Sequence, residues 1–182
     1  IGWHFPNMPH LLSTSGLQDY SQSRDRHDSI TLVHLAKTIQ VQNPQPKFVY
    51  GHILIPHGPF TYDSAGNKIE YTGRLSPEKD MKAYVQQIGY VNRVMTNLVD
   101  NIFQSQKRPF VIIIQGDHGY RFFDREKKML EFPNFNAVYF YNRDYRLVHD
   151  SLTNVNTFPV IFNTFFGQQF PMRQDHQYFL YY

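Results

Sequence analysis

The chain has 182 residues, enough for one domain with a hydrophobic core, and its 41% hydrophobic and 18% charged residues are typical of a globular protein. It contains no cysteine, which excludes disulfides, thiolate metal ligands and a cysteine nucleophile. The net charge of +3 comes without a dense Lys/Arg stripe or a known nucleic-acid-binding module, so no nucleic-acid partner is expected.

The first part of the chain lacks a clear hydrophobic period. Residues 1–28 are rich in Pro, Ser, His, Asp and Arg and are expected to form a loop, while residues 30–40 predict a short helix that NPQP at 43–46 ends. The apolar and aromatic run KFVYGHILIP at 47–56 predicts a strand, which leads into the loop PHGPF. We therefore expect an irregular or edge segment over residues 1–46, followed by the main domain over residues 47–182.

A long helix is predicted after residue 76. Ser76 is the expected N-cap, Pro77 suits the first helical position, and Glu78 and Asp80 favour the positive end of the helix dipole. Apolar residues then recur at three- and four-residue steps as far as Ile102, which indicates an amphipathic helix of about six turns.

The rest of the chain predicts an α/β fold. The runs at 110–115 and 136–142 read as strands, and residues 155–167 read as a final helix with Pro159 in its first turn or at a kink. Helices alternating with nearly all-apolar strands indicate a layered sheet with helices on both faces. In such sheets, sites form at the carboxyl ends of strands, where both PHGPF and GDHG stand.

Asp117 and His118 follow the predicted strand 110–115 directly. Gly116 and Gly119 permit a turn there, so that the carboxylate and the imidazole can point into one cleft. Oxygen and nitrogen ligands of this kind suit Zn²⁺ or Mn²⁺. The alternative is an ordinary turn in which the aspartate accepts backbone hydrogen bonds.

His57 and Arg121 are the other candidate site residues. His57, between two prolines, can donate a hydrogen bond to a phosphoryl or sulfuryl oxygen or bind a second metal; the alternative is a loop histidine packed against tyrosines. Arg121 begins the basic loop RFFDREKK at 121–128, which suits an anionic substrate or is simply a solvated charged loop. His52 is expected to be a buried, hydrogen-bonded core histidine.

Three segments taken together resemble a known family. KFVYGHILIPHGPF, the helix YVQQIGYVNRVMTNLVDNI and PFVIIIQGDHG look like the C-terminal half of a sulfatase-type domain of the alkaline phosphatase superfamily. The similarity is closest to the lipoteichoic acid synthase and phosphoethanolamine transferase branch, and it extends over residues 47–180. It implies that residues 47–182 form the C-terminal portion of an alkaline phosphatase-like catalytic domain.

The resemblance also implies chemistry. Asp117 and His118 match adjacent ligands of a divalent ion (Zn, Mn, Mg or Ca), and His57 matches a catalytic histidine that contacts the substrate head group or a second metal. Arg121 is then a substrate-binding candidate. The implied activity is metal-dependent hydrolysis or head-group transfer on phosphate or sulfate esters, through a Thr, Ser or formylglycine nucleophile.

Two parts of the family pattern have no counterpart. The nucleophile and another acidic ligand lie well upstream of PHGPF in the family, and Ser13, Thr14 and Ser15 lack the expected context. The phosphoethanolamine transferase branch has a further histidine downstream of its Asp-His pair. Residues 126–132 stand in that region here and contain no histidine, so we expect Lys127 or the preceding Arg125 to substitute for it. With Ile1 in place of Met, we expect an inactive C-terminal fragment that needs the N-terminal half of the same protein.

The resemblance implies a parent protein anchored in the bacterial inner membrane through upstream segments, with this domain periplasmic or extracellular. No apolar run in the chain approaches the ~20 residues that cross a bilayer. The alternative function is a non-catalytic binding module that retains the fold and uses the basic loop for a protein or glycan partner.

Overall fold

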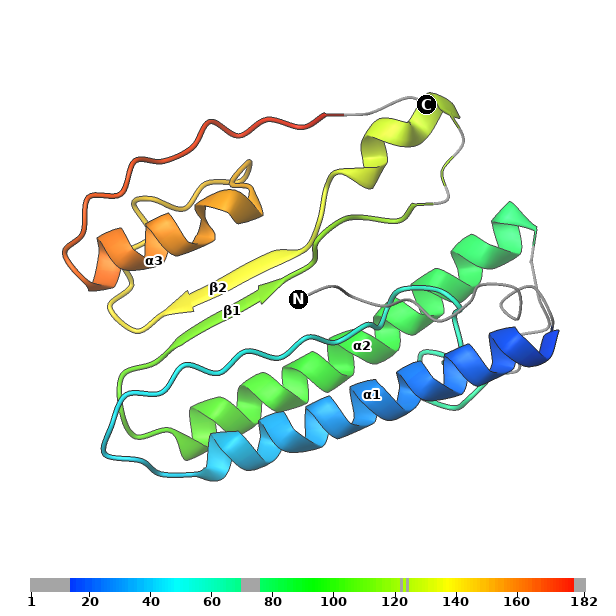
Figure 1. Cartoon of the computed structure of the whole chain (residues 1–182), viewed down its shortest axis with the longest axis horizontal. Helices are drawn as coiled ribbons and strands as arrows, with labels where there is room; N and C mark the ends of the chain where they lie inside the picture. The colour runs from blue at the N-terminus through cyan, green and yellow to red at the C-terminus, as the bar shows by residue number, and fades with distance from the viewer. Residues whose placement is uncertain (1–13, 70–75, 122, 124, 179–182) are drawn as a thin grey trace, which may run out of the picture. The chain divides into compact units, whose positions relative to one another are not determined.

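A computed structural model describes residues 14–69, 76–121, 123 and 125–178. The chain falls into two compact units, Ile1–Lys107 and Arg108–Tyr182. The first unit holds two long helices and the second holds a small sheet with a helix (Figure 1). This mixture of helices and sheet confirms the predicted α/β fold class. The predicted division of the chain at residue 46 stays a prediction.

Helix α1 spans Thr14–Gln40, so the predicted loop is wrong for residues 14–28. Residues 1–13 lie outside the described residues. The error has a physical cause, because the side chains that α1 buries between residues 22 and 28 are charged: Arg24 is 6% exposed and Asp28 is 3% exposed. A helix whose buried face is polar shows no hydrophobic period, and the pattern of apolar residues therefore cannot reveal it.

Helix α2 spans Pro77–Ser105 and begins where the sequence predicts, with Ser76 as N-cap. The Ser76 side chain makes no capping hydrogen bond, although its carbonyl accepts one from the Asp80 amide at 2.9 Å. The predicted apolar stripe differs in one place: Val85 is 57% exposed, whereas Gln87 is fully buried.

The C-terminal ends of α1 and α2 meet. The side-chain amide of Gln106 donates to the Ile39 carbonyl at 2.5 Å, and that of Gln42 donates to the Ser105 carbonyl at 3.2 Å. The two helices also contact each other directly. Among the described residues, no helix combines the length and apolar character needed to cross a membrane.

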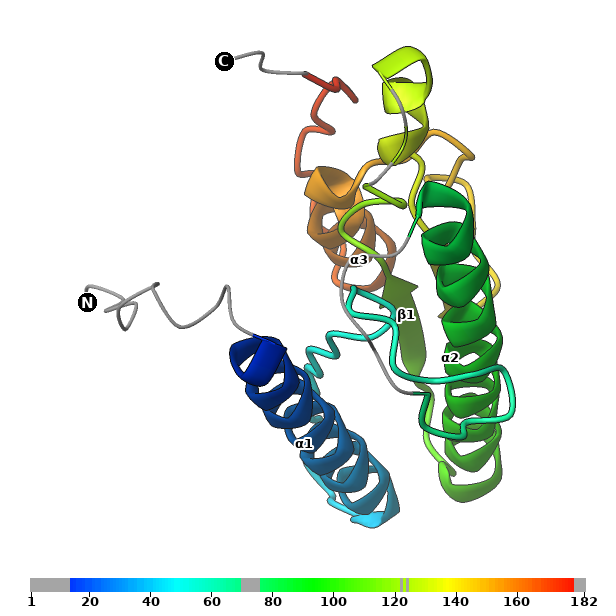
Figure 2. The same ribbon diagram turned by 90° about the vertical axis from the view of Figure 1, so that its right-hand side faces the viewer.

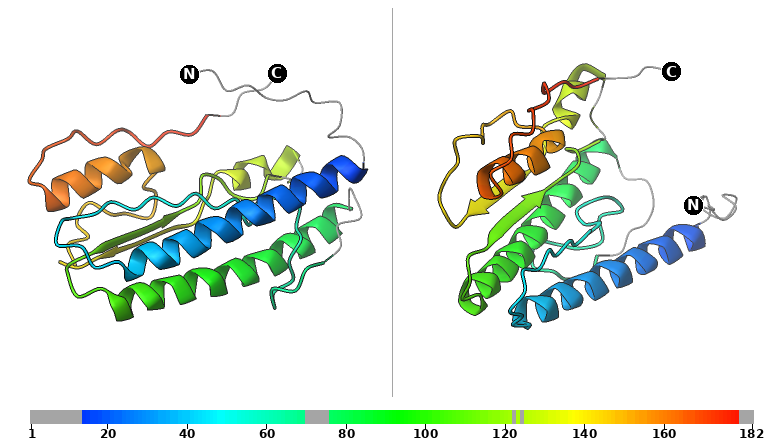
Figure 3. Two further views of the ribbon diagram at one scale, coloured as in Figure 1. Left: turned by 60° about the horizontal axis from the view of Figure 1, so that its bottom comes forward. Right: turned by 60° about the vertical axis from the view of Figure 1, so that its left-hand side comes forward.

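The predicted strand at 47–56 is wrong, because residues 47–54 form no β-ladder with any described residue and residues 55–56 lie in a turn. Phe48 and Tyr50 are 78% and 77% exposed. Lys47 instead donates to the Thr38 and Val41 carbonyls, at 2.6 and 2.9 Å, at the end of α1. The chain from residue 47 to 69 lies against α1 and then α2 (Figures 2 and 3).

Strands β1 (Val111–Gln115) and β2 (Asn136–Phe140) confirm the two strands predicted in the second unit. They pair antiparallel, from Val111 opposite Phe140 to Gln115 opposite Asn136. β2 ends two residues before the predicted end, and Arg143, with φ of 55°, turns the chain back. The predicted basic loop between the strands contains a 3₁₀ helix, Arg125–Glu131.

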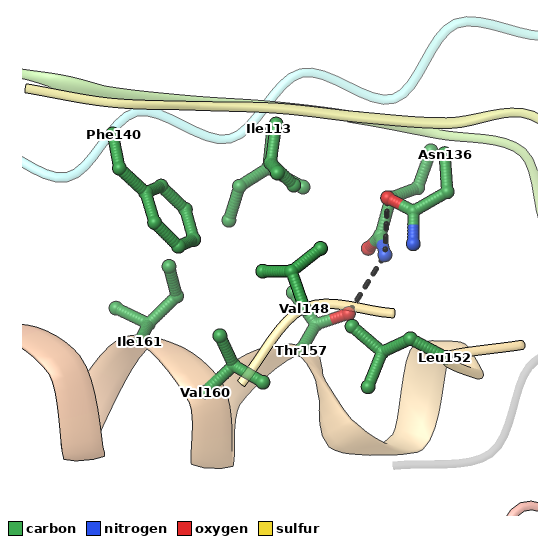
Figure 4. A pocket seen from close by; sticks show the side chains of 10 residues that line it. Ile113, Asn136, Phe140, Val148, Leu152, Thr157, Val160 and Ile161 are labelled. Atoms are coloured by element: carbon green, nitrogen blue, oxygen red, sulfur yellow. Dashed lines mark hydrogen bonds between the residues drawn. The ribbon is translucent and has the colours of Figure 1, made fainter. Parts of the chain in front are cut away.

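Helix α3 (Thr157–Phe165) packs on one face of this sheet, after a short 3₁₀ turn at Asn154–Asn156. Pro159 lies in its first turn, as predicted. Phe140, Leu152 and Val160 form the core between helix and sheet (Figure 4). The Gln115 amide also donates to the Thr157 hydroxyl at 2.7 Å, which ties the end of β1 to the start of α3.

The segment after α3 is held to the second unit by Asp175. Its carboxylate accepts hydrogen bonds from the Thr153 amide at 2.9 Å, from the Thr153 hydroxyl, and from the Asn156 side chain at 3.0 Å. The hydrogen bonds from Thr153 lower the pKa of this carboxyl from its usual 3.8. Since these donors favour the ionised form, Asp175 contributes more to stability when it is charged.

We expect Phe140→Ala to lower the free energy of unfolding by about 3–5 kcal/mol, because it removes a ring that is 1% exposed and leaves a cavity between β2 and α3. Phe166→Ala is the control: this ring is 63% exposed, and its loss should cost less than about 1 kcal/mol. Denaturant titration of both variants measures the difference. Equal losses would contradict this assignment of the core.

A second prediction concerns how stability changes with pH. Because the folded pKa of Asp175 is lowered, its contribution is fully present above the unfolded pKa and is lost as the pH falls through the folded value. Asp175→Asn should therefore unfold at a lower temperature than the wild type above about pH 4, and the gap should close in stronger acid. Thermal unfolding over a pH series tests this, with the exposed Asp150→Asn as control. A gap that does not change with pH would contradict it.

Candidate functional site

Three hydrogen bonds at Gly116 hold the carboxyl end of β1. The Gly116 amide donates to the Phe135 carbonyl at 2.8 Å. Its carbonyl accepts from the side-chain amides of Asn134, at 2.6 Å, and Asn154, at 2.9 Å. The residue before Asp117 is therefore fixed to both neighbouring loops, and the backbone that carries the candidate metal ligands has little freedom to move.

Asp117 and His118 lie side by side at this point. The Asp117 Oδ1 atom is 3.7 Å from His118 Nε2, and the two side chains are 88% and 23% exposed. His118 Nδ1 is 2.6 Å from the Gly119 carbonyl oxygen. A carbonyl oxygen can only accept, so Nδ1 carries the proton and, in the neutral ring, Nε2 carries the lone pair. The lone pair is thus on the nitrogen nearer the carboxylate.

Gly119 is required for close backbone packing rather than for a special turn. Neither Gly116 nor Gly119 has a positive φ. A Cβ atom on Gly119 would instead lie 2.5 Å from the Pro133 carbonyl oxygen and 3.1 Å from that of Glu131. The Gly119 amide also donates to the Glu131 carbonyl at 2.8 Å, so this residue anchors His118 to the end of the 3₁₀ helix.

His57 lies in the first unit, in a turn closed by a hydrogen bond from its amide to the Leu54 carbonyl at 2.8 Å. Its ring repeats the arrangement of His118, since Nδ1 lies 2.7 Å from the carbonyl oxygen of the following glycine, Gly58. The residue is exposed, and by the same argument its neutral ring carries the lone pair on Nε2. His52, which we expected to be buried, is exposed because residues 47–52 join no sheet.

Arg121 is exposed, two residues beyond Gly119. Part of the basic segment that follows it has structural partners: Lys128 pairs with Glu131 at 2.5 Å and donates to the Arg121 carbonyl at 3.4 Å. The Arg121 side chain itself stays a candidate for an anionic group. Residues 122 and 124 lie outside the described residues.

The donor types at the end of β1 fit a divalent metal, but they are few. Asp117 offers a carboxylate oxygen and His118 an imidazole nitrogen, with the other ring nitrogen bonded to a carbonyl, an arrangement common among metal-binding histidines. Within the ranges that the structure describes, no group of three or more His, Asp or Glu side chains gathers to hold an ion. The pair therefore fits as two ligands of a site and not as a complete one.

Comparison with known proteins identifies the family to which these residues belong. The sulfatase family profile matches residues 3–177, nearly the whole chain. The chain belongs to the sulfatase family. The match is consistent with the alkaline phosphatase superfamily named from the sequence, and it extends the similarity upstream of residue 47. No curated protein and no solved structure matches this sulfatase chain. The lipoteichoic acid synthase and phosphoethanolamine transferase branch stays a prediction.

Sequence reasoning missed the residues that hold the two candidate loops in place. They are side chains whose hydrogen bonds end on loop backbone: Asn134 and Asn154 at Gly116, and Arg24, Asp28 and Gln87 around His57. Asparagine is common in loops, and Arg24, Asp28 and Gln87 lie in helices where polar residues are usually solvated. Nothing in the spacing of these residues pointed to their partners.

We expect Gly119→Ala to lower stability by about 1–3 kcal/mol, because the added methyl group meets backbone carbonyls that cannot rotate away. Since Gly119 also supplies the oxygen that holds His118, the side-chain ¹⁵N shifts of His118 should change in the same variant. Gly116→Ala is the matched control, because its nearest contact is an ordinary 3.6 Å. Similar stability and His118 shifts in the two variants would contradict this role of Gly119.

Proposed function

We propose that this sulfatase chain carries part of the catalytic centre of a metal-dependent hydrolase or transferase that acts on phosphate or sulfate esters. The observation that carries the proposal is the geometry at the end of β1: the Asp117 carboxylate and His118 Nε2 lie 3.7 Å apart, and Nδ1 of His118 is held by Gly119. An anchored imidazole beside a carboxylate offers two ligands to one cation with little loss of side-chain freedom.

Asp117 and His118 would hold the ion, which can be Zn²⁺, Mn²⁺, Mg²⁺ or Ca²⁺. A divalent ion bound there would stabilise the negative charge that develops on the transferred group. The other ligands and the nucleophile are not among the residues that we assign. We propose that the upstream half of the same domain supplies these ligands and the nucleophile, and that this chain alone is inactive.

His57 orients the departing or transferring group. Nδ1 is bonded to the Gly58 carbonyl, so we assign this task to Nε2. The neutral ring can offer the Nε2 lone pair to a metal ion, and the protonated ring can donate a hydrogen bond from Nε2 to a phosphoryl or sulfuryl oxygen. Arg121 binds the anionic part of the substrate, for which a guanidinium is suited by its paired donors.

The resemblance that led to this family also suggests where the enzyme works. We place the catalytic domain on the outer side of a bacterial inner membrane, tethered through upstream segments. Ester groups on lipids or envelope polymers would then be accessible to it.

A second candidate function is a binding module that has kept the fold and lost the chemistry. It is favoured by one observation: the described residues gather no group of three metal-binding side chains. In that case the basic segment that begins at Arg121 contacts a protein or glycan. Metal binding by the whole protein separates the two candidates.

The test is Asp117→Ala in the whole protein. Loss of a direct ligand should weaken Mn²⁺ or Zn²⁺ binding by more than about 10-fold, the lower end of what removing a supporting residue costs, and ester hydrolysis should fall with it. Calorimetric titration with each ion alone, followed by assays with and without a chelator, measures both effects.

Asp150→Ala is the matched control, because it removes an exposed carboxylate from the same unit. Full metal occupancy and unchanged activity in Asp117→Ala would overturn the assignment of Asp117. A wild-type protein that binds neither ion would favour the binding module instead.

A further inference from the structure

Helix α1 buries two charged side chains on one face. Arg24 and Asp28 are 6% and 3% exposed and lie four residues apart, so they project from adjacent turns toward the same neighbour. That neighbour is the loop that carries His57. Burying a charged group is costly unless it makes strong hydrogen bonds, and to this loop Arg24 makes three and Asp28 makes two.

Arg24 reaches the carbonyl groups on both sides of the turn. Its guanidinium donates to the His57 carbonyl at 2.8 Å, to the Leu54 carbonyl at 3.5 Å, and to the Gly58 carbonyl. Among side chains, only a guanidinium has a planar fork of donors that can reach several acceptors at once in a fixed geometry. The three carbonyls are thereby held around one rigid group.

Asp28 and Gln87 hold the two ends of the same loop. The Asp28 carboxylate accepts from the Leu54 amide at 2.8 Å and the Ile55 amide at 3.0 Å. On the other side, the buried Gln87 of α2 accepts from the Thr61 amide at 2.8 Å and the Tyr62 amide at 3.2 Å. The backbone from Leu54 to Tyr62 is thus fixed by side chains from both helices.

The Gly58 carbonyl is the contact shared by Arg24 and the His57 ring. It accepts from Arg24 and also from Nδ1 of His57, at 2.7 Å. The direction of this carbonyl decides which ring nitrogen of His57 carries the proton, because the hydrogen bond at one nitrogen sets the role of the other.

We infer that Arg24 is a positioning residue for His57. It fixes the carbonyl that keeps the His57 proton on Nδ1 and so presents Nε2 to the substrate or the metal, while Asp28 supports it by holding the start of the loop. This inference rests on the proposed function of His57. A merely structural Arg24 would stabilise the loop without setting the protonation of the ring.

The first test reads the ring directly, by side-chain ¹⁵N NMR of the whole chain above the pH at which histidines are charged. In the wild type, His57 should show a protonated Nδ1 and an unprotonated Nε2. In Arg24→Gln, the two ring shifts should move toward each other as the two neutral forms mix. Arg146→Gln is the matched control, because it breaks an arginine–carboxylate pair on the surface, 2.7 Å long, and should leave the His57 shifts unchanged.

Two results would overturn the inference. One is a wild-type His57 with its proton on Nε2, which needs no variant. The other is a folded Arg24→Gln protein whose His57 shifts match the wild type. If Arg24→Gln does not fold, Arg24→Lys takes its place: a single ammonium cannot reproduce the fork that serves the His57 and Gly58 carbonyls, so unchanged ring shifts there would equally overturn it.

His57→Ala separates this inference from the proposed function. If ester hydrolysis and Mn²⁺ binding by the whole protein are unchanged in His57→Ala, the proposed role of His57 is wrong. The His57 ring shifts of the wild type and of Arg24→Gln still report whether Arg24 sets the protonation of that ring. If His57→Ala abolishes hydrolysis but the Arg24 variants keep the wild-type ring form, the function stands and the positioning role falls.

Discussion

The need to satisfy backbone polar groups outside helices and sheets shapes both candidate loops. A buried carbonyl or amide without a partner costs about as much as a lost hydrogen bond, so loops that carry functional residues need donors and acceptors from elsewhere. Here side chains supply them. Arg24, Asp28 and Gln87 bind the loop around His57, and Asn134 and Asn154 bind the carbonyl just before Asp117. The candidate residues therefore stand on irregular backbone that is nevertheless fixed.

The two candidate histidines share one local arrangement, although they lie in different units. In each, Nδ1 donates to the carbonyl of the glycine that follows, at 2.7 Å for His57 and 2.6 Å for His118. A histidine held in this way loses less freedom when Nε2 binds a ligand. The glycine after His118 also packs too closely against carbonyls to carry a side chain, which explains the residue type there without reference to turn conformation.

How far the sequence predicts this protein depends on what each element buries. α2, β1, β2 and α3 carry apolar side chains in the patterns typical of amphipathic helices and apolar strands, and those patterns located them to within a few residues. The first half of α1 buries Arg24 and Asp28, so it reads as a loop. Residues 47–56 have the composition of a strand, but a ladder requires a partner that composition does not specify. Asp117, His118 and His57 are predicted as site residues from motif and resemblance, whereas the residues that hold their loops depend on contacts between distant segments.

The exposed run from Lys47 to His52 has a consequence for handling the protein. It is extended, rich in aromatic and β-branched residues and free of proline, with Phe48 and Tyr50 more than three-quarters exposed. Such a segment is a template for pairing between molecules at high concentration, the first step toward aggregates. Pairing through this stretch, next to the candidate site, would lower the solubility of the chain. Dilution makes such encounters rarer, and at low ionic strength the net charge of +3 keeps the molecules apart most strongly.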